Sequence, residues 1–365
     1  IVIVAAAWRG VLEAAQRFDL ISAVRVPSTI ANYLLPLVAI AAEWALPGVM
    51  AVLVGARAAT LAAFWALAYR AVPALRQGPA LRRGRVRELA GYGGWVSLSS
   101  VVSPILVYLD RLLLGVLVSM SAVAYYAAPY EVVNRLAILP ASVVGALFPA
   151  LSALGGQAQW DRIRRLASLS VKVVLLMMAP FAVVMIGGAS VLLGWWLGPE
   201  FAAQSAWALV ILTVGIAVNA VAQVPYTVLQ GVGRADVAAK FHLLELPIHA
   251  ALVWALVGRW GIVGAALSWT VRITLDAALL FWAAGRLAGL SPRMLGGAGV
   301  WRMAAFVAAA LAAAVALEWG AAGVGVRAAM LVAVLGVLAA AAWRLGLSGE
   351  DRARLAGALR LAGDR

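Results

Sequence analysis

Residues 107–115 read VYLDRLLLG, with an aspartate and an arginine side by side inside an apolar run. A charged side chain at the centre of a lipid bilayer costs about 2.5–3.5 kcal/mol on insertion scales. Apolar runs close to 20 residues long recur along the whole chain, which is the length that a helix needs to cross the hydrocarbon core. The reason for keeping Asp110 and Arg111 in such a run must therefore lie in the segments around it.

The composition is that of a membrane protein. Of the 365 residues, 65% are hydrophobic and only 12% are charged, and the mean hydropathy is +0.98. The apolar runs are continuous rather than alternating, which favours helices over the strands of a transmembrane barrel. We expect an all-α fold, a polytopic helical membrane protein. The sequence has no cysteine and therefore no disulfide or thiolate-metal site.

Hydropathy predicts a series of spanning segments after a partial one at residues 1–8, which looks like the end of a helix whose start lies upstream. The predicted spans are 21–43, 46–70, 94–118, 122–148, 170–192, 205–229, 241–258, 262–285, 301–318 and 324–343.

The connections between these segments alternate in charge. The connection at 70–88 is rich in arginine, the one near 118–121 has no basic residue, 151–169 is basic again, and 194–201 is not; Arg259 is the exception. Basic residues collect on the cytoplasmic side of membrane proteins. The net charge of +14 is thus explained by topology and calls for no nucleic-acid partner.

An internal repeat links two parts of the chain. Residues 11–19, VLEAAQRFD, match residues 228–236, VLQGVGRAD, 217 positions later, and the same offset pairs Phe64-Trp65 with Phe281-Trp282. This pattern predicts a parallel repeat of two helical bundles. The partner of a second bundle that begins near residue 94 would begin roughly 120 residues before this chain does, so we expect the first bundle to be largely missing.

These observations divide the chain into five expected parts. They are a remnant of the first transmembrane bundle (1–72), a basic cytoplasmic linker (73–93), a second six-helix bundle (94–287), a C-terminal transmembrane helix pair (300–343) and a cytoplasmic basic amphipathic tail (344–365).

Polar side chains recur on the predicted spans of the second bundle. Ser99, Ser103 and Asp110 share one helical face, Glu131 with Arg135 and Arg272 with Asp276 are i, i+4 pairs, and a polar stripe follows the 205–229 span. Such groups indicate a wet cavity that binds substrate; the alternatives are ion pairs that only neutralise each other and hydrogen bonds between helices. The candidate cavity residues are Asp110, Arg111, Glu131, Asn134, Arg135, Asn219, Gln223, Tyr226, Gln230, Arg272 and Asp276.

One constellation is similar to a metal site. His242, Glu245 and His249 share a helical face, but the two histidines would lie about 10 Å apart along the axis, which is too far for one ion. We expect no metal and no catalytic residue, and assign the histidines to a cavity edge or a proton relay.

Several stretches together resemble a known family. They are RGVLEAAQRFDLISAVRVPS (9–28), GWVSLSSVVSPILVYLDRLLLG (94–115), YYAAPYEVVNRLAILPASVVGALFPALS (125–152) and WWLGPEFAAQSAWAL (195–209). They are similar to oligosaccharide flippases of the O-antigen type, in the multidrug/oligosaccharidyl-lipid/polysaccharide exporter superfamily. The resemblance covers nearly the whole chain.

The resemblance implies two six-helix lobes around a central cavity and a final helix pair. It implies a flippase of the bacterial inner membrane that moves undecaprenyl-pyrophosphate-linked oligosaccharide between leaflets by alternating access, for surface polysaccharide biosynthesis, with a polysaccharide polymerase as a candidate partner. In the related lipid II flippases the arginine matching Arg135 lies in a cationic cavity, and an aspartate stands at the position of Asn134. The resemblance implies no cofactor, and coupling to a proton or a sodium gradient stays open.

Two other functions remain alternatives. A cation-coupled multidrug exporter of the same superfamily would have a cavity dominated by acidic residues. A membrane enzyme of polysaccharide assembly, a polymerase or a ligase, would need a sizeable outer loop or a cluster of carboxylates and histidines at the interface. The predicted outer loops are short, and we therefore expect a carrier and not an enzyme.

Overall fold

The structure is a computed structural model, and it describes all residues except 74, 76–82, 157–158, 298, 321–322 and 342–365. The chain divides into two compact units, Ile1–Arg87 and Glu88–Arg365. We describe each unit by itself. The expected tail at 344–365 lies outside the described residues, as does part of the linker expected at 73–93.

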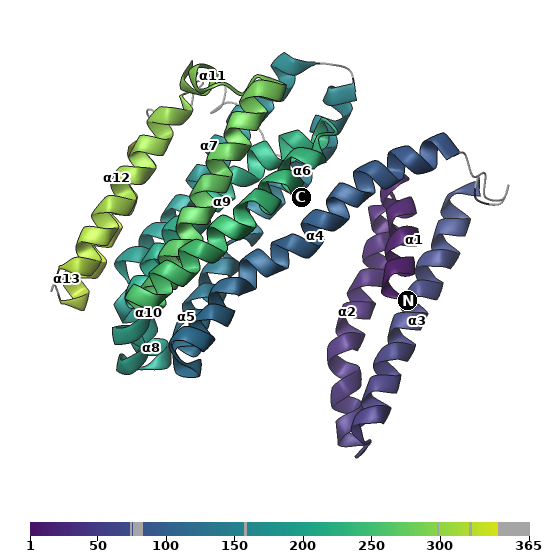
Figure 1. Ribbon diagram of the computed structural model, residues 1–365, viewed down its shortest axis with the longest axis horizontal. Coiled ribbons are helices and arrows are strands. Elements are labelled where there is room, and N and C mark those ends of the chain that lie inside the picture. The colour runs from purple at the N-terminus through teal and green to yellow at the C-terminus, as the bar shows by residue number, and fades with distance from the viewer. Residues whose placement is uncertain (74, 76–82, 157–158, 298, 321–322, 342–365) are drawn as a thin grey trace, which may run out of the picture. The chain divides into compact units, whose positions relative to one another are not determined.

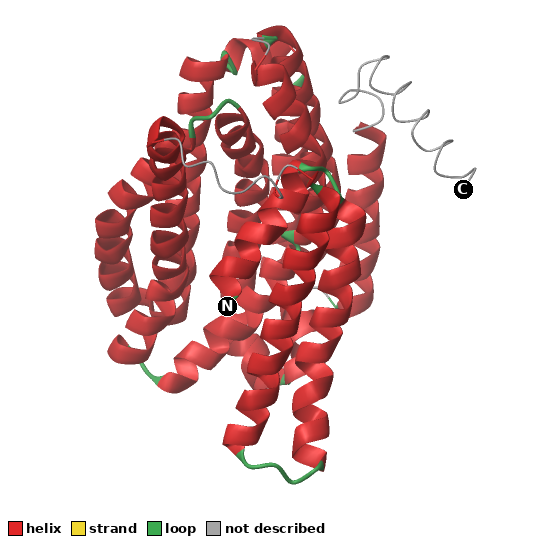
Figure 2. Ribbon diagram, turned by 90° about the vertical axis from the view of Figure 1, so that its right-hand side faces the viewer, coloured by secondary structure: helices red, strands yellow, loops and turns green. Residues whose placement is uncertain are grey.

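Helices are the regular elements of the described residues, as Figure 2 shows. Eight of these helices are long and apolar enough to cross a membrane, and a bent helix pair makes up to nine. The protein is therefore a polytopic all-α membrane protein, as the composition predicted. Large apolar side chains such as Ile3, Leu37 and Val332 face outward, which suits helices whose solvent is lipid.

The first unit contains α1 (Val2–Ala14), α2 (Phe18–Ala41) and α3 (Leu46–Ala71). A small core holds them together, in which Leu12 from α1, Ile21 from α2 and Phe64 from α3 are buried. Ser28 and Thr60 join α2 to α3 through a hydrogen bond of 2.8 Å between their hydroxyl groups.

The second unit has one continuous apolar core, built mainly around α9. Two further helices, α12 and α13, lie against α7 (Figure 1). The helices that follow α3 are α4 (Arg83–Leu117), α5 (Met120–Arg135), α6 (Ile138–Gly156), α7 (Trp160–Gly187), α8 (Ala189–Leu197), α9 (Pro199–Gly231), α10 (Ala235–Ala288), α11 (Pro292–Gly297), α12 (Val300–Trp319) and α13 (Val324–Ala341).

The span predicted at 122–148 is broken, and this corrects the sequence interpretation. Helix α5 ends at Arg135, α6 begins at Ile138, and the two are bent by 41°. Pro140 supplies the cause, because proline has no N–H to donate and its ring clashes with the carbonyl four residues earlier, that of Leu136. The break places Asn134 and Arg135 at a helix end.

Other boundaries were also wrong by several residues. Helix α1 continues to Ala14 rather than residue 8, and α7 begins at Trp160 rather than residue 170. Short helix α8 was not predicted. The basic connection expected at 151–169 is thus largely helical. Charged side chains lower the hydropathy of a helix end without ending the helix, so hydropathy underestimates its length.

Helix α10 contains both of the spans predicted at 241–258 and 262–285. Its 54 residues would be about 80 Å long if straight, but the backbone leaves the helical region at Gly261, where φ is 52°. A Cβ on Gly264 would lie 2.0 Å from the carbonyl oxygen of Leu256. The two halves of α10 therefore form a tight hairpin, which brings Glu245 to Arg272.

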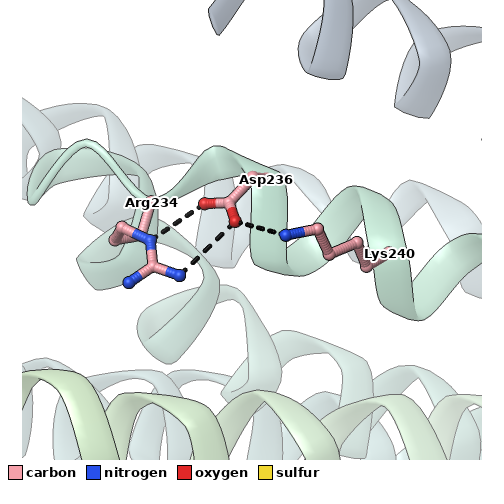
Figure 3. Close-up of polar contacts among 3 residues, drawn as sticks. All are labelled: Arg234, Asp236 and Lys240. Atoms are coloured by element: carbon pink, nitrogen blue, oxygen red, sulfur yellow. Dashed lines mark hydrogen bonds and ion pairs between the residues drawn. The ribbon is translucent and has the colours of Figure 1, made fainter.

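The sequence repeat corresponds to a repeated turn. Between α9 and α10 the backbone N–H of Arg234 donates to the carbonyl of Leu229 at 2.8 Å, and between α1 and α2 that of Arg17 donates to Leu12 at 2.9 Å. The arginine Nε then donates to an aspartate two residues on, Asp236 or Asp19, at 2.9 Å in both cases. Lys240 adds a second cation at 2.8 Å in the second copy only (Figure 3).

Candidate functional site

A polar cavity of about 350 Å³ lies inside the second unit. Helices α4, α5, α9 and α10 supply its walls. The residues that line it are Ser103, Leu106, Val107, Tyr130, Asn134, Asn219, Ala222, Gln223, Tyr226, His242, Trp269, Arg272, Ile273, Asp276 and Leu280. Its polar side chains come from helices whose outer surfaces are apolar, so the cavity is a polar hollow inside an apolar bundle.

The stripe on α9 supplies the uncharged part of this lining. Asn219, Gln223 and Tyr226 follow each other at i, i+4 and i+7 and all line the cavity, whereas Gln230, one turn further, does not. Asn134 joins them from the end of α5. Each of these three amide side chains offers both donors and acceptors, so this wall can bind a ligand that is rich in hydroxyl groups.

Arg272 is the cation of the cavity, and its partner differs from the one that the sequence suggested. Its Nη1 lies 3.3 Å from Oε2 of Glu245 across the α10 hairpin, and the two side chains are 8% and 0% exposed. Among the described residues no ion pair joins Arg272 to Asp276, the i, i+4 neighbour. Asp276 lines the cavity beside it.

Asp110 is sequestered from the cavity. It is fully buried, accepts a hydrogen bond from the hydroxyl of Tyr126, and accepts another from the backbone N–H of Arg111 at 2.7 Å. It does not line the cavity. Its immediate contacts are those of a satisfied structural carboxylate.

Arg111 lies on the far side of a cavity wall. Its Nη2 lies 3.3 Å from Oε1 of Glu131, so Glu131 pairs with Arg111 and not with Arg135. The guanidinium covers the ring of Tyr130 at 4.2 Å, and Tyr130 packs edge-on against Trp269 at 5.6 Å. Tyr130 and Trp269 both line the cavity, whereas Arg111 does not. Arg111 therefore supports the cavity wall from behind and does not face the interior of the cavity.

Arg135 is exposed at the end of α5, just before the break. It has no ion pair or hydrogen bond within the described part of the chain, and it does not line the cavity described above. Of the candidate residues, the cavity brings together Asn134, Asn219, Gln223, Tyr226, Arg272 and Asp276; the others, Asp110, Arg111, Glu131, Arg135 and Gln230, lie outside it.

His242 lines the cavity, whereas His249 is not part of its lining. His242 Nδ1 lies 3.4 Å from the hydroxyl of Ser103, and His249 is fully buried. Within the residues that the structure describes, no group of three metal-ligating side chains could hold an ion.

Sequence reasoning missed three residues that shape the site. Glu245 was considered only with the histidines, although a carboxylate on the first half of a helical hairpin is a natural partner for Arg272 on the second. Tyr130 and Trp269 were not singled out, because single aromatic residues in an apolar sequence carry no pattern. In the first unit, Arg57 is an exposed cation within α3 that lines a separate cavity of about 140 Å³.

Comparison with known proteins identifies the family of the chain. A family model described as "Polysaccharide biosynthesis protein" matches residues 7–206. The chain is 33% identical over 196 residues to a protein of Shigella flexneri named "Putative O-antigen transporter", an alignment that covers 54% of this chain and 46% of that protein. The chain thus spans about half the length of this curated relative. Because the family model covers more than half of the chain, the protein belongs to the polysaccharide biosynthesis family.

Proposed function

We propose that this protein is a flippase that translocates a polyprenyl-pyrophosphate-linked oligosaccharide, in bacteria the undecaprenyl form, across the inner membrane. The polar cavity inside an apolar helical bundle is the single observation that carries the proposal. A membrane protein needs such a hollow only if something insoluble in hydrocarbon passes through or binds there. Membership of the polysaccharide biosynthesis family supports a glycan as that cargo.

The cavity lining suits the sugar part of such a cargo. Gln223, Asn219 and Asn134 present amide donors and acceptors, and Tyr226 and Tyr130 present hydroxyls on aromatic rings. Hydroxyl groups of a sugar lose their hydration on entering the bilayer, and these side chains replace it with hydrogen bonds. Translocation of this kind makes and breaks no covalent bond, so the proposal includes no catalytic residue.

The diphosphate needs a cation, and two positions can supply one. Arg272 lines the cavity and would exchange its contact with Glu245 for a phosphate oxygen, while Arg135 is an exposed guanidinium at the α5–α6 break. The guanidinium fork matches phosphate geometry. The polyprenyl tail stays in lipid, and alternating access of the cavity to the two leaflets moves the headgroup.

An export assay tests the proposal in the full-length protein that contains this chain. In cells whose own flippase is deleted, the Gln223→Leu variant should lose most export of lipid-linked oligosaccharide, because leucine removes donors and acceptors from the cavity wall at similar size. Thr274→Val is the matched control, since Thr274 is exposed on α10 and does not line the cavity. Normal export by Gln223→Leu at normal protein level would contradict the proposal.

A cation-coupled multidrug exporter is the second candidate, and one observation favours it. The cavity lining contains one arginine and one carboxylate, Arg272 and Asp276, and a second carboxylate, Glu245, pairs with Arg272. Cells that express the full-length protein should then resist cationic dyes. Dye resistance without rescue of oligosaccharide export would support the multidrug exporter.

An enzyme of polysaccharide assembly can be tested separately. Incubation of the purified protein with labelled polyprenyl-linked sugar should yield no new covalent product, and such a product would instead indicate a polymerase or ligase.

A further inference from the structure

A second cavity of the second unit, which we call the apolar pocket, has a volume of about 610 Å³. Residues of α7, α9, α10, α11 and α12 line it. Val221 and Phe281 belong to this lining, whereas their chain neighbours Ala222 and Leu280 line the polar cavity. Among the described residues the two cavities have no lining residue in common. The apolar pocket and the polar cavity therefore lie on different faces of α9 and α10.

The apolar pocket opens on the outer surface of the bundle. Trp282 and Trp301 both line it, and their side chains are 59% and 54% exposed. The indole N–H of Trp301 donates to the carbonyl of Pro292 at 2.8 Å, which orients this ring at the rim. Exposed indoles on spanning helices lie in the lipid at the level of the headgroups. A lipid molecule can thus reach the pocket directly from the bilayer.

A single cation lies in the otherwise apolar lining. Arg286 belongs to the last turn of α10, and its guanidinium lies 5.9 Å from the ring of Trp282. Within the described part of the chain, Arg286 makes no ion pair and no hydrogen bond. The hydroxyl group of Ser291 lies in the same lining. A guanidinium without an acidic partner, beside an apolar pocket, has the right chemistry for a phosphate that carries an apolar chain.

The connection from α10 to α12 carries further positive charge. Arg293 and Arg302 are both exposed there, and with Arg286 they give this end of the pocket three arginines without a carboxylate between them in the sequence. Basic connections lie on the cytoplasmic side of membrane proteins. The charged end of the pocket is therefore assigned to the cytoplasmic leaflet, whose anionic lipids attract basic residues near the membrane surface.

The depth of the pocket matches one leaflet. Its lining residues on α10 run from Ala278 to Arg286, which is about 12 Å along the helix at 1.5 Å per residue. Half of the hydrocarbon core is about 15 Å thick. An acyl chain of a phospholipid runs over this depth from the headgroup to the middle of the bilayer, whereas a polyprenyl chain would leave most of its length outside the pocket.

We propose that the apolar pocket binds an anionic phospholipid of the cytoplasmic leaflet, with one acyl chain in the pocket and the phosphate on Arg286. The bound lipid contacts α10, α11 and α12 together and so stabilises the packing of α12 on the bundle. This site is separate from the polar cavity, and the proposal does not depend on the proposed function.

Native mass spectrometry of the full-length protein tests the charge requirement, with phosphatidylglycerol and phosphatidylcholine of the same acyl chains as probes. The wild type should bind phosphatidylglycerol more tightly. Arg286→Gln should weaken that binding about fivefold and leave phosphatidylcholine binding unchanged. Arg259→Gln is the control, because Arg259 is an exposed arginine at the other end of the α10 hairpin. Equal binding of the two lipids by the wild type would overturn the proposal, as would equal binding of phosphatidylglycerol by the wild type and Arg286→Gln.

Thermal unfolding tests the place of the acyl chain. A ligand that binds only the folded protein raises its melting temperature, so phosphatidylglycerol should stabilise the wild type. Ala304→Phe fills the pocket from α12 and should abolish this shift, whereas Ala309→Phe, on the exposed face of α12, should keep it. If Ala304→Phe does not fold, loss of the shift in Arg286→Gln decides the question. A full shift in Arg286→Gln would contradict the site.

Competition with a polyprenyl phosphate distinguishes a bilayer lipid from the tail of the proposed cargo. The polyprenyl phosphate should displace phosphatidylglycerol only at a higher concentration. Displacement at an equal or lower concentration would overturn the proposal and assign the pocket to the cargo. These assays measure lipid binding and not export, so their failure would leave the proposed function standing, and a failure of export would leave the lipid site standing.

Discussion

Gln16 and Gly233 have the same left-handed backbone conformation, with φ values of 55° and 80°. They lie in the two copies of the repeated turn between helices, Gln16 between α1 and α2 and Gly233 between α9 and α10. The two positions are 217 residues apart, and the hydrogen bonds on either side of them match. Glycine adopts positive φ at no steric cost, whereas a residue with a Cβ does not. The first copy of the turn is therefore strained where the second is not.

This difference predicts opposite effects of two substitutions. Gln16→Gly should stabilise the protein by about 1 kcal/mol, and Gly233→Gln should destabilise it by about the same amount. Thermal unfolding of the full-length protein in detergent measures both changes. No Cβ contact limits the second substitution, because nothing lies within 4 Å of a Cβ at Gly233. The same sign for both variants would contradict the assigned strain.

A second prediction concerns the close approach of α9 and α10 at Gly215. A Cβ at this position would lie 2.5 Å from Cζ3 of Trp269 and 2.7 Å from Oγ1 of Thr270. Gly215→Ala should therefore cost about 1–3 kcal/mol by overpacking. Because Trp269 lines the cavity, export should fall as well.

Gly336→Ala is the matched control for this prediction. Gly336 lies on the exposed side of α13, and no heavy atom lies within 4 Å of a Cβ there. Alanine should raise the stability of that helix by roughly 0.5–1 kcal/mol. If Gly215→Ala were as harmless as Gly336→Ala in thermal unfolding, the contact between α9 and α10 would be looser than the structure shows.

The third prediction concerns a partly buried ion pair that joins α12 and α13 to the break between α7 and α8. Arg327 Nη1 lies 2.9 Å from Oε2 of Glu318 and 2.8 Å from the hydroxyl of Ser190. Arg327→Ala leaves Glu318 largely shielded from solvent without a counterion and should destabilise the protein by about 1–3 kcal/mol. Limited proteolysis should then cut α12 and α13 from the bundle faster than in Arg302→Ala, which changes an exposed arginine. Equal cleavage rates would argue against a structural role for the pair.

The sequence predicted the all-α class because an apolar run of spanning length can satisfy its backbone hydrogen bonds within the bilayer as a helix. It also predicted the two halves of α10, since Arg259 and Gly261 interrupt the apolar run there. It did not predict the break after Arg135. A proline inside a spanning helix does not by itself predict a break, because Pro225 and Pro247 lie inside α9 and α10 without a break at either position.

Charge partners were harder to predict than helices. Spacing of i, i+4 suggested the pairs Glu131–Arg135 and Arg272–Asp276, but the structure pairs Arg111 with Glu131 and Arg272 with Glu245. Spacing along one helix says which residues share a face, whereas the partner depends on which helix lies opposite. In a bundle the nearest opposite charge is often on the neighbouring helix, and that neighbour is not visible in a single sequence.

The last prediction concerns Asp110, the aspartate of VYLDRLLLG. Its burial without access to the cavity indicates a structural carboxylate, held by the hydroxyl of Tyr126 and the backbone N–H of Arg111. Tyr126→Phe removes one donor from a fully buried acceptor and should cost about 1–3 kcal/mol in thermal unfolding. Tyr125→Phe is the adjacent control, because the Tyr125 hydroxyl donates to Glu200 at an exposed site and its loss should have a smaller effect.

The rate of export per folded molecule distinguishes this structural role of Asp110 from a role in transport. If Asp110 only orders α4 against α5, Tyr126→Phe should reduce the amount of folded protein but leave export per folded molecule near that of the wild type. Asp110→Asn keeps the shape but has one acceptor oxygen instead of two, so it retains only one of the two hydrogen bonds and should behave in the same way as Tyr126→Phe. A loss of export per folded molecule in Asp110→Asn that Tyr126→Phe does not show would instead place Asp110 in the transport pathway, because Tyr126→Phe removes a hydrogen bond of Asp110 but keeps its charge.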